Sequence, residues 1–144
     1  MRQDEIEIRR LVEEKAAALR ARDAKAMVSA YDPGAVRYTL APPLRQPGDA
    51  RDAEPVEHWL ATFEGPVDTE VRDLAVTVDG DVAFCTSLNR LTATPRGQAE
   101  SFTLWHRSTL GLRRIDGAWR VTHEHDSVPF EMDGSFRASL NLTP

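Results

Sequence analysis

The sequence predicts an α+β fold in which three N-terminal helices pack on one face of a curved, mostly antiparallel sheet. Two observations indicate this class. Apolar residues recur with helical periodicity in the first part of the chain, whereas from residue 67 onward apolar and polar residues alternate in long segments separated by Gly-containing turns. Because helices and strands are segregated along the chain, the helices are expected to share one side of the sheet.

Three helices are expected before residue 65. The first is indicated by apolar residues at three- and four-residue steps, namely Ile8, Leu11, Val12, Ala16 and Leu19. Asp23 is suited to cap a short second helix, because its carboxylate can accept from free N–H groups of the first turn. The third helix has Pro55 in its first turn and is expected to end at Gly65-Pro66. Its apolar face comprises Val56, Trp59, Leu60 and Phe63.

A short strand and a long loop lie between the second and third helices. Residues 35–40 alternate in polarity and predict the strand, after a break at Asp32-Pro33-Gly34. Residues 41–54 are rich in Pro and Gly and have no periodic pattern. A loop of this length either forms the rim or lid of a pocket or serves as a plain surface connection.

The remaining chain predicts four long antiparallel strands. A three-residue turn at Asp79-Gly80-Asp81 would pair Val78 with Val82 and place Arg90 on the same face as the apolar row. An arginine in that position either extends toward solvent or binds an anion.

The last hairpin leaves two registers open. With a two-residue turn at Asp116-Gly117, one face collects His106, Ser108, His123, His125 and Ser127. With a three-residue loop the register slips by one, and the face of His106 instead collects Ser108, Leu110, Glu124 and Asp126. The apolar pattern of Leu110, Leu112 and Val121 favours the first register.

Composition excludes several classes of protein. The 144 residues suit a single domain spanning 1–144, and the net charge of -5 argues against a nucleic-acid partner. No apolar run approaches the length needed to span a bilayer, and the N-terminus lacks a signal-peptide core. Cys85 is the single cysteine, so no internal disulfide can form. A cytoplasmic protein is expected.

The segment from Trp119 to Phe130, W-R-V-T-H-E-H-D-S-V-P-F, is unusually polar for a strand. In an acid–base reading, His123 or His125 is the base, because imidazole titrates near neutral pH, and Asp126 lies beside them. A His-x-His metal site with His106 lacks further ligands on that face, and Ser127 lacks the glycine turn of a serine nucleophile. Neither a metal nor a cofactor is therefore expected.

Residues 105–130, W-H-R-S-T-L-G-L-R-R-I-D-G-A-W-R-V-T-H-E-H-D-S-V-P-F, resemble the C-terminal segment of SnoaL-like and ketosteroid-isomerase-like proteins of the NTF2-like superfamily. The His-x-His-x-Ser run and Arg90-Leu91-Thr92 are also similar to the association domain of calcium/calmodulin-dependent protein kinase. The resemblance implies a cone-shaped α+β fold that encloses a pocket, and a homodimer. It is specific for the fold but not for the chemistry, because this fold carries many unrelated functions.

The catalytic residues of ketosteroid isomerases are not found here. The early strand offers Tyr38 near the position of their carboxylate base, and the first helix has no tyrosine. The resemblance to the kinase domain implies a pocket arginine at Arg90 and an anionic ligand such as a carboxylate. The expected ligand-binding residues are Arg90, Tyr38, Trp59, His106, Arg107 and Ser127.

Two functions remain open at this stage. The first is a small-molecule pocket protein that acts as a cofactor-independent acid–base enzyme, of isomerase, cyclase or hydrolase type, on a carbonyl-containing or cyclic substrate. Its catalytic residues would be His123, His125 and Asp126. The second is a non-catalytic oligomeric module that binds a small anion at Arg90.

Overall fold

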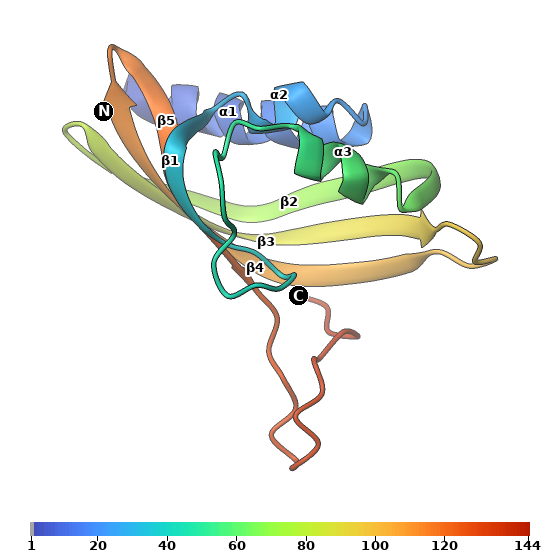
Figure 1. Ribbon diagram of the computed structural model, residues 1–144. Helices are drawn as coiled ribbons and strands as arrows, with labels where there is room; N and C mark the ends of the chain where they lie inside the picture. The colour runs from blue at the N-terminus through green and yellow to red at the C-terminus, as the bar shows by residue number, and fades with distance from the viewer. Residues whose placement is uncertain (1) are drawn as a thin grey trace.

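A computed structural model describes residues 2–144 of the chain. It contains three helices, α1 (Arg2–Arg20), α2 (Ala24–Val28) and α3 (Glu54–Leu60), gathered on one side of a curved five-stranded sheet (Figure 1). The strands in sheet order are β1 (Tyr31–Tyr38), β5 (Ala118–Ser127), β4 (Phe102–Ile115), β3 (Val82–Pro95) and β2 (Phe63–Asp79). β1 runs parallel to β5, and the other neighbours are antiparallel. The predicted α+β class is confirmed.

The helix ends follow local chemistry, with one correction. Asp23 caps α2 by accepting a hydrogen bond from the backbone N–H of Ala26 at 3.1 Å, as predicted. α3 ends at Leu60, whereas the sequence pattern extended it to Phe63. Phe63 instead begins β2, and Gly65-Pro66 lies inside that strand. β2 is an edge strand with an irregular register there, so a residue without an N–H is tolerated.

The turn between β2 and β3 differs from the prediction by one residue. Asp79 pairs with Val82, so the turn has two residues and the register shifts. Val82 and Phe84 consequently lie on the outer face of the sheet, about half exposed, and Arg90 shares that face. The prediction that Arg90 continues a core-facing row is therefore wrong, because a one-residue slip reverses every side chain of a strand.

The core lies between α1 and the ends of the strands next to the β2–β3 and β4–β5 turns. Ile8 and Val12 of α1 pack there against the inward side chains of β3, β4 and β5, which include Ala83, Cys85, Leu112 and Val121. The start of α1 is joined to the β4–β5 hairpin by Asp4, which accepts hydrogen bonds from Arg114 and from Nε1 of Trp119. Among residues 2–144, no helix is long and apolar enough to cross a membrane.

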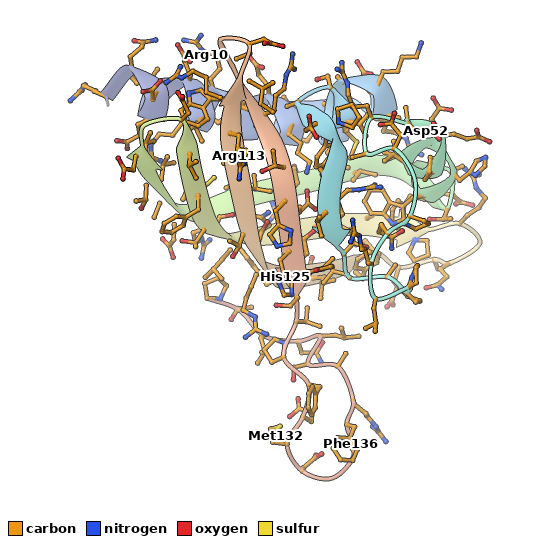
Figure 2. The ribbon with its side chains drawn as sticks, turned by 60° about the vertical axis from the view of Figure 1, so that its left-hand side comes forward. Arg10, Asp52, Arg113, His125, Met132 and Phe136 are labelled. Carbon is orange, nitrogen blue, oxygen red and sulfur yellow. The ribbon has the colours of Figure 1, made fainter. Side chains whose placement is uncertain are left out.

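Residues 128–144 form an arm that projects from the body of the molecule (Figures 1 and 2). A bridge between Phe130 and Ala138 and a hydrogen bond from the N–H of Glu131 to the carbonyl of Arg137 hold it in a hairpin shape. Met132 and Phe136 near its tip are 86% and 74% exposed. The arm therefore buries little of its apolar surface against the rest of the chain.

Deleting residues 132–144 should lower Tm by less than about 3 °C, because little apolar area is lost from the core. A thermal melt of the shortened and full-length proteins measures this. The matched control is Leu112→Ala, which removes a side chain that is 1% exposed and should cost about 2 to 5 kcal/mol. A fall in Tm on deletion as large as that caused by Leu112→Ala would show that the arm packs on the body.

Candidate functional site

The turn of the β4–β5 hairpin has the two-residue form that one of the two predicted registers assumed. Ile115 pairs with Ala118. The two turn residues, Asp116 and Gly117, have φ angles of 51° and 81°. Positive φ at both positions matches the right-handed twist of the flanking strands, and glycine adopts it without steric cost.

A β-bulge then reverses the faces of β5. Leu112 pairs with Val121, but Gly111 pairs with His123, so Thr122 is an extra residue in β5. Beyond the bulge, the face toward the helices carries His106, Ser108, Leu110, Glu124 and Asp126. The first register, which placed His123 and His125 on the face of His106, is therefore wrong about these faces, and the set of residues that the second register placed with His106 is confirmed. The bulge inside the strand, and not the turn, decides which side chains point inward.

A partly buried ionic cluster occupies this inner face. Lys15 of α1 donates from Nζ to the hydroxyl of Tyr31 and to Oε1 of Glu124, both at 2.6 Å. The Tyr31 hydroxyl in turn donates to the same oxygen of Glu124. Ser108 and Asp126 complete the set through hydrogen bonds that link Ser108 to Asp126 and Asp126 to Glu124. These five residues are called the inner cluster below.

Glu124 is held in its ionised form although it is only 7% exposed. Burial alone would raise its pKa, but the charge of Lys15 and hydrogen bonds from its neighbours outweigh burial and hold the pKa well below the usual range. The negative charge of Glu124 also overcomes burial at Lys15 and raises the pKa of the lysine. Burial raises the pKa of Tyr31, so the phenol stays protonated and remains a donor.

Asp126 has the opposite protonation state. Burial raises the pKa of its carboxyl group to about 9, and the adjacent Glu124 carboxylate contributes through a hydrogen bond and through charge repulsion. Two neighbouring carboxylates share one proton more easily than they both ionise, and here Lys15 fixes the charge on Glu124. Asp126 is therefore a neutral carboxylic acid at pH 7, able to donate a hydrogen bond or a proton.

His106 adds a neutral imidazole to the same face. Burial lowers the pKa of its ring, and the ring lies within electrostatic range of Glu124 and Lys15. Its Nδ1 lies 3.5 Å from the carbonyl oxygen of Arg107. Because a carbonyl only accepts, this contact places the proton on Nδ1 and leaves a lone pair on Nε2. The inner face thus combines a neutral base with a neutral acid.

The two histidines of β5 lie on the outer face with Tyr38. The Tyr38 ring packs edge-on against His123 and His125, at centroid distances of 5.1 and 5.4 Å. Nδ1 of His123 donates to the carbonyl of Val36 at 2.7 Å. His125 is exposed (Figure 2). The predicted catalytic role of these histidines stays a prediction, and they do not meet the inner cluster.

Arg90, Arg107 and Ser127 also lie away from the inner face. Arg90 forms ion pairs with Asp68 at 3.0 Å and with Glu70 at 3.5 Å. Two carboxylates thus already neutralise its charge, and anion binding at Arg90 stays untested. Nε of Arg107 donates to Oγ of Ser127 at 3.1 Å in an exposed position.

Trp59 belongs to α3, is 38% exposed and packs edge-on against Phe63 at 5.2 Å. This contact gives it a packing role at the end of α3. A wall position in a ligand pocket stays a prediction.

Sequence reasoning missed Lys15 and Tyr31. A signal was present for Lys15, because it lies three residues after Val12 and four before Leu19, on the apolar stripe of the first helix. A cation on that stripe requires a buried partner. Tyr31 lies before the predicted strand at residues 35–40, whereas β1 begins at Tyr31 and has an irregular register between Tyr31 and Val36.

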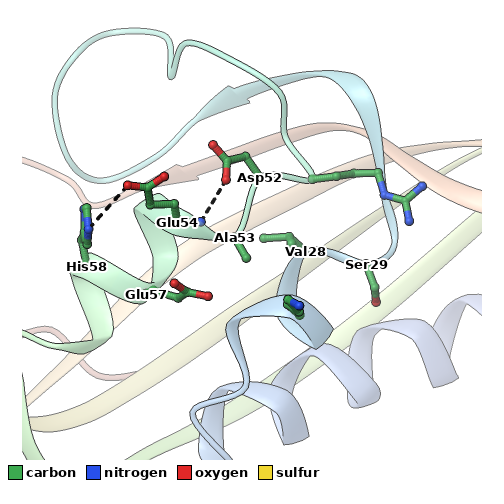
Figure 3. A pocket seen from close by; sticks show the side chains of 9 residues that line it. Val28, Ser29, Asp52, Ala53, Glu54, Glu57 and His58 are labelled. Carbon is green, nitrogen blue, oxygen red and sulfur yellow. Dashed lines mark hydrogen bonds and ion pairs between the residues drawn. The ribbon is translucent and has the colours of Figure 1, made fainter.

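A hollow on the surface lies elsewhere. An open depression of about 610 Å³ lies between α2 and α3 (Figure 3). Its lining includes Lys25, Arg51, Glu57 and His58, and no member of the inner cluster reaches it. The inner cluster is taken as the candidate site because buried, electrostatically coupled groups with perturbed pKa values mark functional sites more often than exposed charge pairs do. Across residues 2–144, no group of three or more His, Cys, Asp or Glu side chains is placed to hold a metal ion.

Known proteins resemble this chain in sequence and in fold. Residues 8–131 match the model of the SnoaL-like domain. An NTF2-like protein of unknown function from Pseudomonas putida is 31% identical over 100% of this chain and 99% of its own, with a TM-score of 0.87. A putative scytalone dehydratase from Novosphingobium aromaticivorans is 13% identical, covers 98% of this chain and 94% of its own, and has a TM-score of 0.77.

A putative calcium/calmodulin-dependent protein kinase II association domain from Xanthomonas campestris is 19% identical over 84% of both chains, with a TM-score of 0.70. Likeness at this level of identity shows the shared fold. No curated protein matches the sequence. The match over most of the chain shows that this protein belongs to the SnoaL-like domain family of the NTF2-like superfamily.

Proposed function

We propose that this protein is a cofactor-independent acid–base enzyme that moves a proton on a carbonyl-containing substrate bound at the inner face of the sheet. One observation carries the proposal: the neutral carboxyl group of Asp126 shares the inner, partly buried face of the sheet with the neutral imidazole of His106. General acid–base catalysis requires a weak acid and a weak base whose different surroundings set their pKa values apart.

The chemistry follows from the protonation states. Nε2 of His106 takes a proton from the carbon next to the substrate carbonyl, and the electron pair of that C–H bond moves toward the oxygen. Asp126 turns its O–H from Glu124 to the substrate oxygen and donates its proton, or a strong hydrogen bond, as negative charge develops there, while Lys15 and Tyr31 still donate to Glu124. Return of the proton from His106 to a different carbon, with return of the enol O–H proton to Asp126, gives an isomer. Departure of a hydroxyl group from the next carbon as water, protonated by His106, with return of the enol O–H proton to Asp126, gives a dehydration. Attack of the enol carbon on a second carbonyl of the substrate, whose oxygen His106 protonates, with return of the enol O–H proton to Asp126, gives a cyclisation.

Lys15, Tyr31 and Glu124 have a supporting role in this scheme. Their three hydrogen bonds converge on one carboxylate and keep its charge fixed. The fixed charge in turn keeps the proton on Asp126. Asp126 is therefore already protonated when the substrate charge forms, and only its O–H has to turn from Glu124 to the substrate oxygen.

The names of similar structures support the reaction class in broad terms. Besides the putative scytalone dehydratase, a putative dehydratase of the NTF2-like family from Streptomyces avermitilis is 17% identical, with a TM-score of 0.73. Dehydration beside a carbonyl begins with the same proton removal as isomerisation, so either outcome is compatible with the inner cluster.

Deuterium exchange tests the proposal without knowledge of the natural substrate. Cyclohexanone and 2-tetralone would be incubated with the protein in D₂O, and loss of the protons next to the carbonyl followed by NMR. Wild type should exceed the buffer rate, and His106→Gln or Asp126→Asn should each slow the exchange by about 10² to 10⁴.

Two further variants make the result specific. His58→Gln changes an exposed histidine of α3 and should leave the exchange rate unchanged. If His125→Gln removes exchange while His106→Gln does not, the base is on the outer face and the proposed assignment fails. Absence of exchange above the buffer rate with both ketones would contradict the reaction class.

A further inference from the structure

One polar group on the inner side of the sheet has no role in the proposed proton transfer. Arg37 of β1 pairs with Glu124 of β5 in the parallel register, so its side chain leaves the sheet on the same face. Its Nη2 donates to the carbonyl of Pro47 at 3.0 Å. Its Nε is buried and has no hydrogen-bond partner. Buried N–H groups without an acceptor are rare, and each calls for an explanation.

The loop after β1 is hydrogen-bonded to the backbone of this strand. The N–H of Gln46 donates to the carbonyl of Arg37 at 2.9 Å, and the N–H of Ala50 donates to the carbonyl of Pro33 at 3.0 Å. The loop after β1 therefore runs beside this strand, and Ala50 is fully buried. These contacts position Arg37 but provide no acceptor for its Nε–H.

Arg37 also lacks a counter-charge. Among residues 2–144, no acidic side chain forms an ion pair with it, whereas Arg90 and Arg114 each have two carboxylate partners. At pH 7 the charges of Lys15 and Glu124 cancel, and Asp126 and His106 are neutral. The guanidinium therefore leaves a positive charge on the inner face, which an anionic ligand would complement.

We infer that the substrate carries a carboxylate or a similar anionic group, which Arg37 binds through Nε–H and a free N–H of its guanidinium. This inference rests on the proposed function, because the same molecule presents its carbonyl to Asp126. Asp126 lies two residues beyond Glu124, about 6.6 Å further along the strand. A ketone whose carboxylate is several bonds from the carbonyl can therefore reach both groups.

A matched pair of probes tests the substrate class. The probes are 4-oxocyclohexanecarboxylate and its amide, which share shape and carbonyl but differ in charge. Calorimetry on the full-length protein should show that wild type binds the carboxylate about tenfold or more tightly than the amide. Arg37→Gln should remove this preference and leave the affinity for the amide unchanged, which also shows that the variant is folded.

Three other variants separate the alternatives. Arg37→Lys keeps the charge but loses the planar pair of donors, so it should retain part of the preference. Arg113→Gln changes an exposed arginine of β4 and should retain all of it (Figure 2). Asp126→Asn should lose deuterium exchange and keep the preference, which distinguishes failure of the catalytic proposal from failure of the substrate class.

Several results would overturn the inference. One is equal affinity of wild type for the two probes, and another is no binding of either probe below about 10 mM. A third is loss of the preference in Arg90→Gln with retention in Arg37→Gln, which would place the anion on the outer face. In each case deuterium exchange is measured separately, so the proposed proton transfer can still be confirmed when the inference about the anionic group fails.

Discussion

Replacing Lys15 by methionine should lower the free energy of unfolding by about 3 to 5 kcal/mol at pH 7, because it leaves the buried Glu124 carboxylate without its cation. Methionine keeps most of the length and apolar stem of lysine, so the effect measures charge and not volume. Chemical denaturation monitored by circular dichroism gives the value for both proteins. A variant less stable by under about 1 kcal/mol would show that Glu124 is adequately solvated without Lys15.

The pH dependence of this loss has a defined sign. In wild type the pKa of Glu124 is depressed, so its contribution to stability is present above the unfolded pKa near 4.5 and is lost as pH falls through the folded value. Without Lys15, burial should instead raise the pKa of Glu124, so the variant should regain stability as pH falls toward 4.5 and Glu124 takes up a proton. The gap between the two proteins should therefore narrow as pH falls from 7, and narrow further below about 4.5 as wild type loses its own contribution. The double variant Lys15→Met, Glu124→Gln should recover part of the loss, because no uncompensated charge is left.

Replacing Asp126 by asparagine should make the protein relatively more stable as the pH rises. The folded pKa of Asp126, about 9, lies above its unfolded value of 3.8. Between these values the unfolded chain releases a proton that the folded chain keeps, so wild type loses up to about 1.4 kcal/mol of stability per pH unit. This contribution is complete below the unfolded pKa and is lost as pH rises through the folded pKa.

Asparagine cannot ionise, and its amide can still donate to Glu124, so the variant should lack this slope. The stability difference, variant minus wild type, should grow by about 1 to 2.5 kcal/mol from pH 6 to pH 8. Urea unfolding at several pH values measures it. Asp79→Asn, which changes an exposed carboxyl at the β2–β3 turn, should follow the wild-type profile. Parallel profiles for wild type and Asp126→Asn would mean that Asp126 is ionised when folded, and the proposed acid would be lost.

Part of the candidate site could be read from local patterns. The polar run after Trp119 drew attention to β5, and Asp126 and His106, which the proposed function uses, were both among the expected site residues. The two-residue turn at Asp116-Gly117 was one of two possibilities that local turn chemistry allowed. The sequence did not predict which side of β5 faces inward. The extra residue, Thr122, lies in a polar segment, where a bulge causes no visible break in the alternation of apolar and polar residues.

The sequence by itself determined the α+β class, the helix periodicity, the cap at Asp23 and the family, because these depend on local patterns and on a motif that spans one hairpin. Only the tertiary structure decided the site. Lys15, Tyr31 and Glu124 meet across as many as 109 sequence positions, and the register at the bulge turns Asp126 inward. The protonation of Asp126 depends on its burial and on the charge of the adjacent Glu124 carboxylate, and both exist only when α1 is packed on the folded sheet.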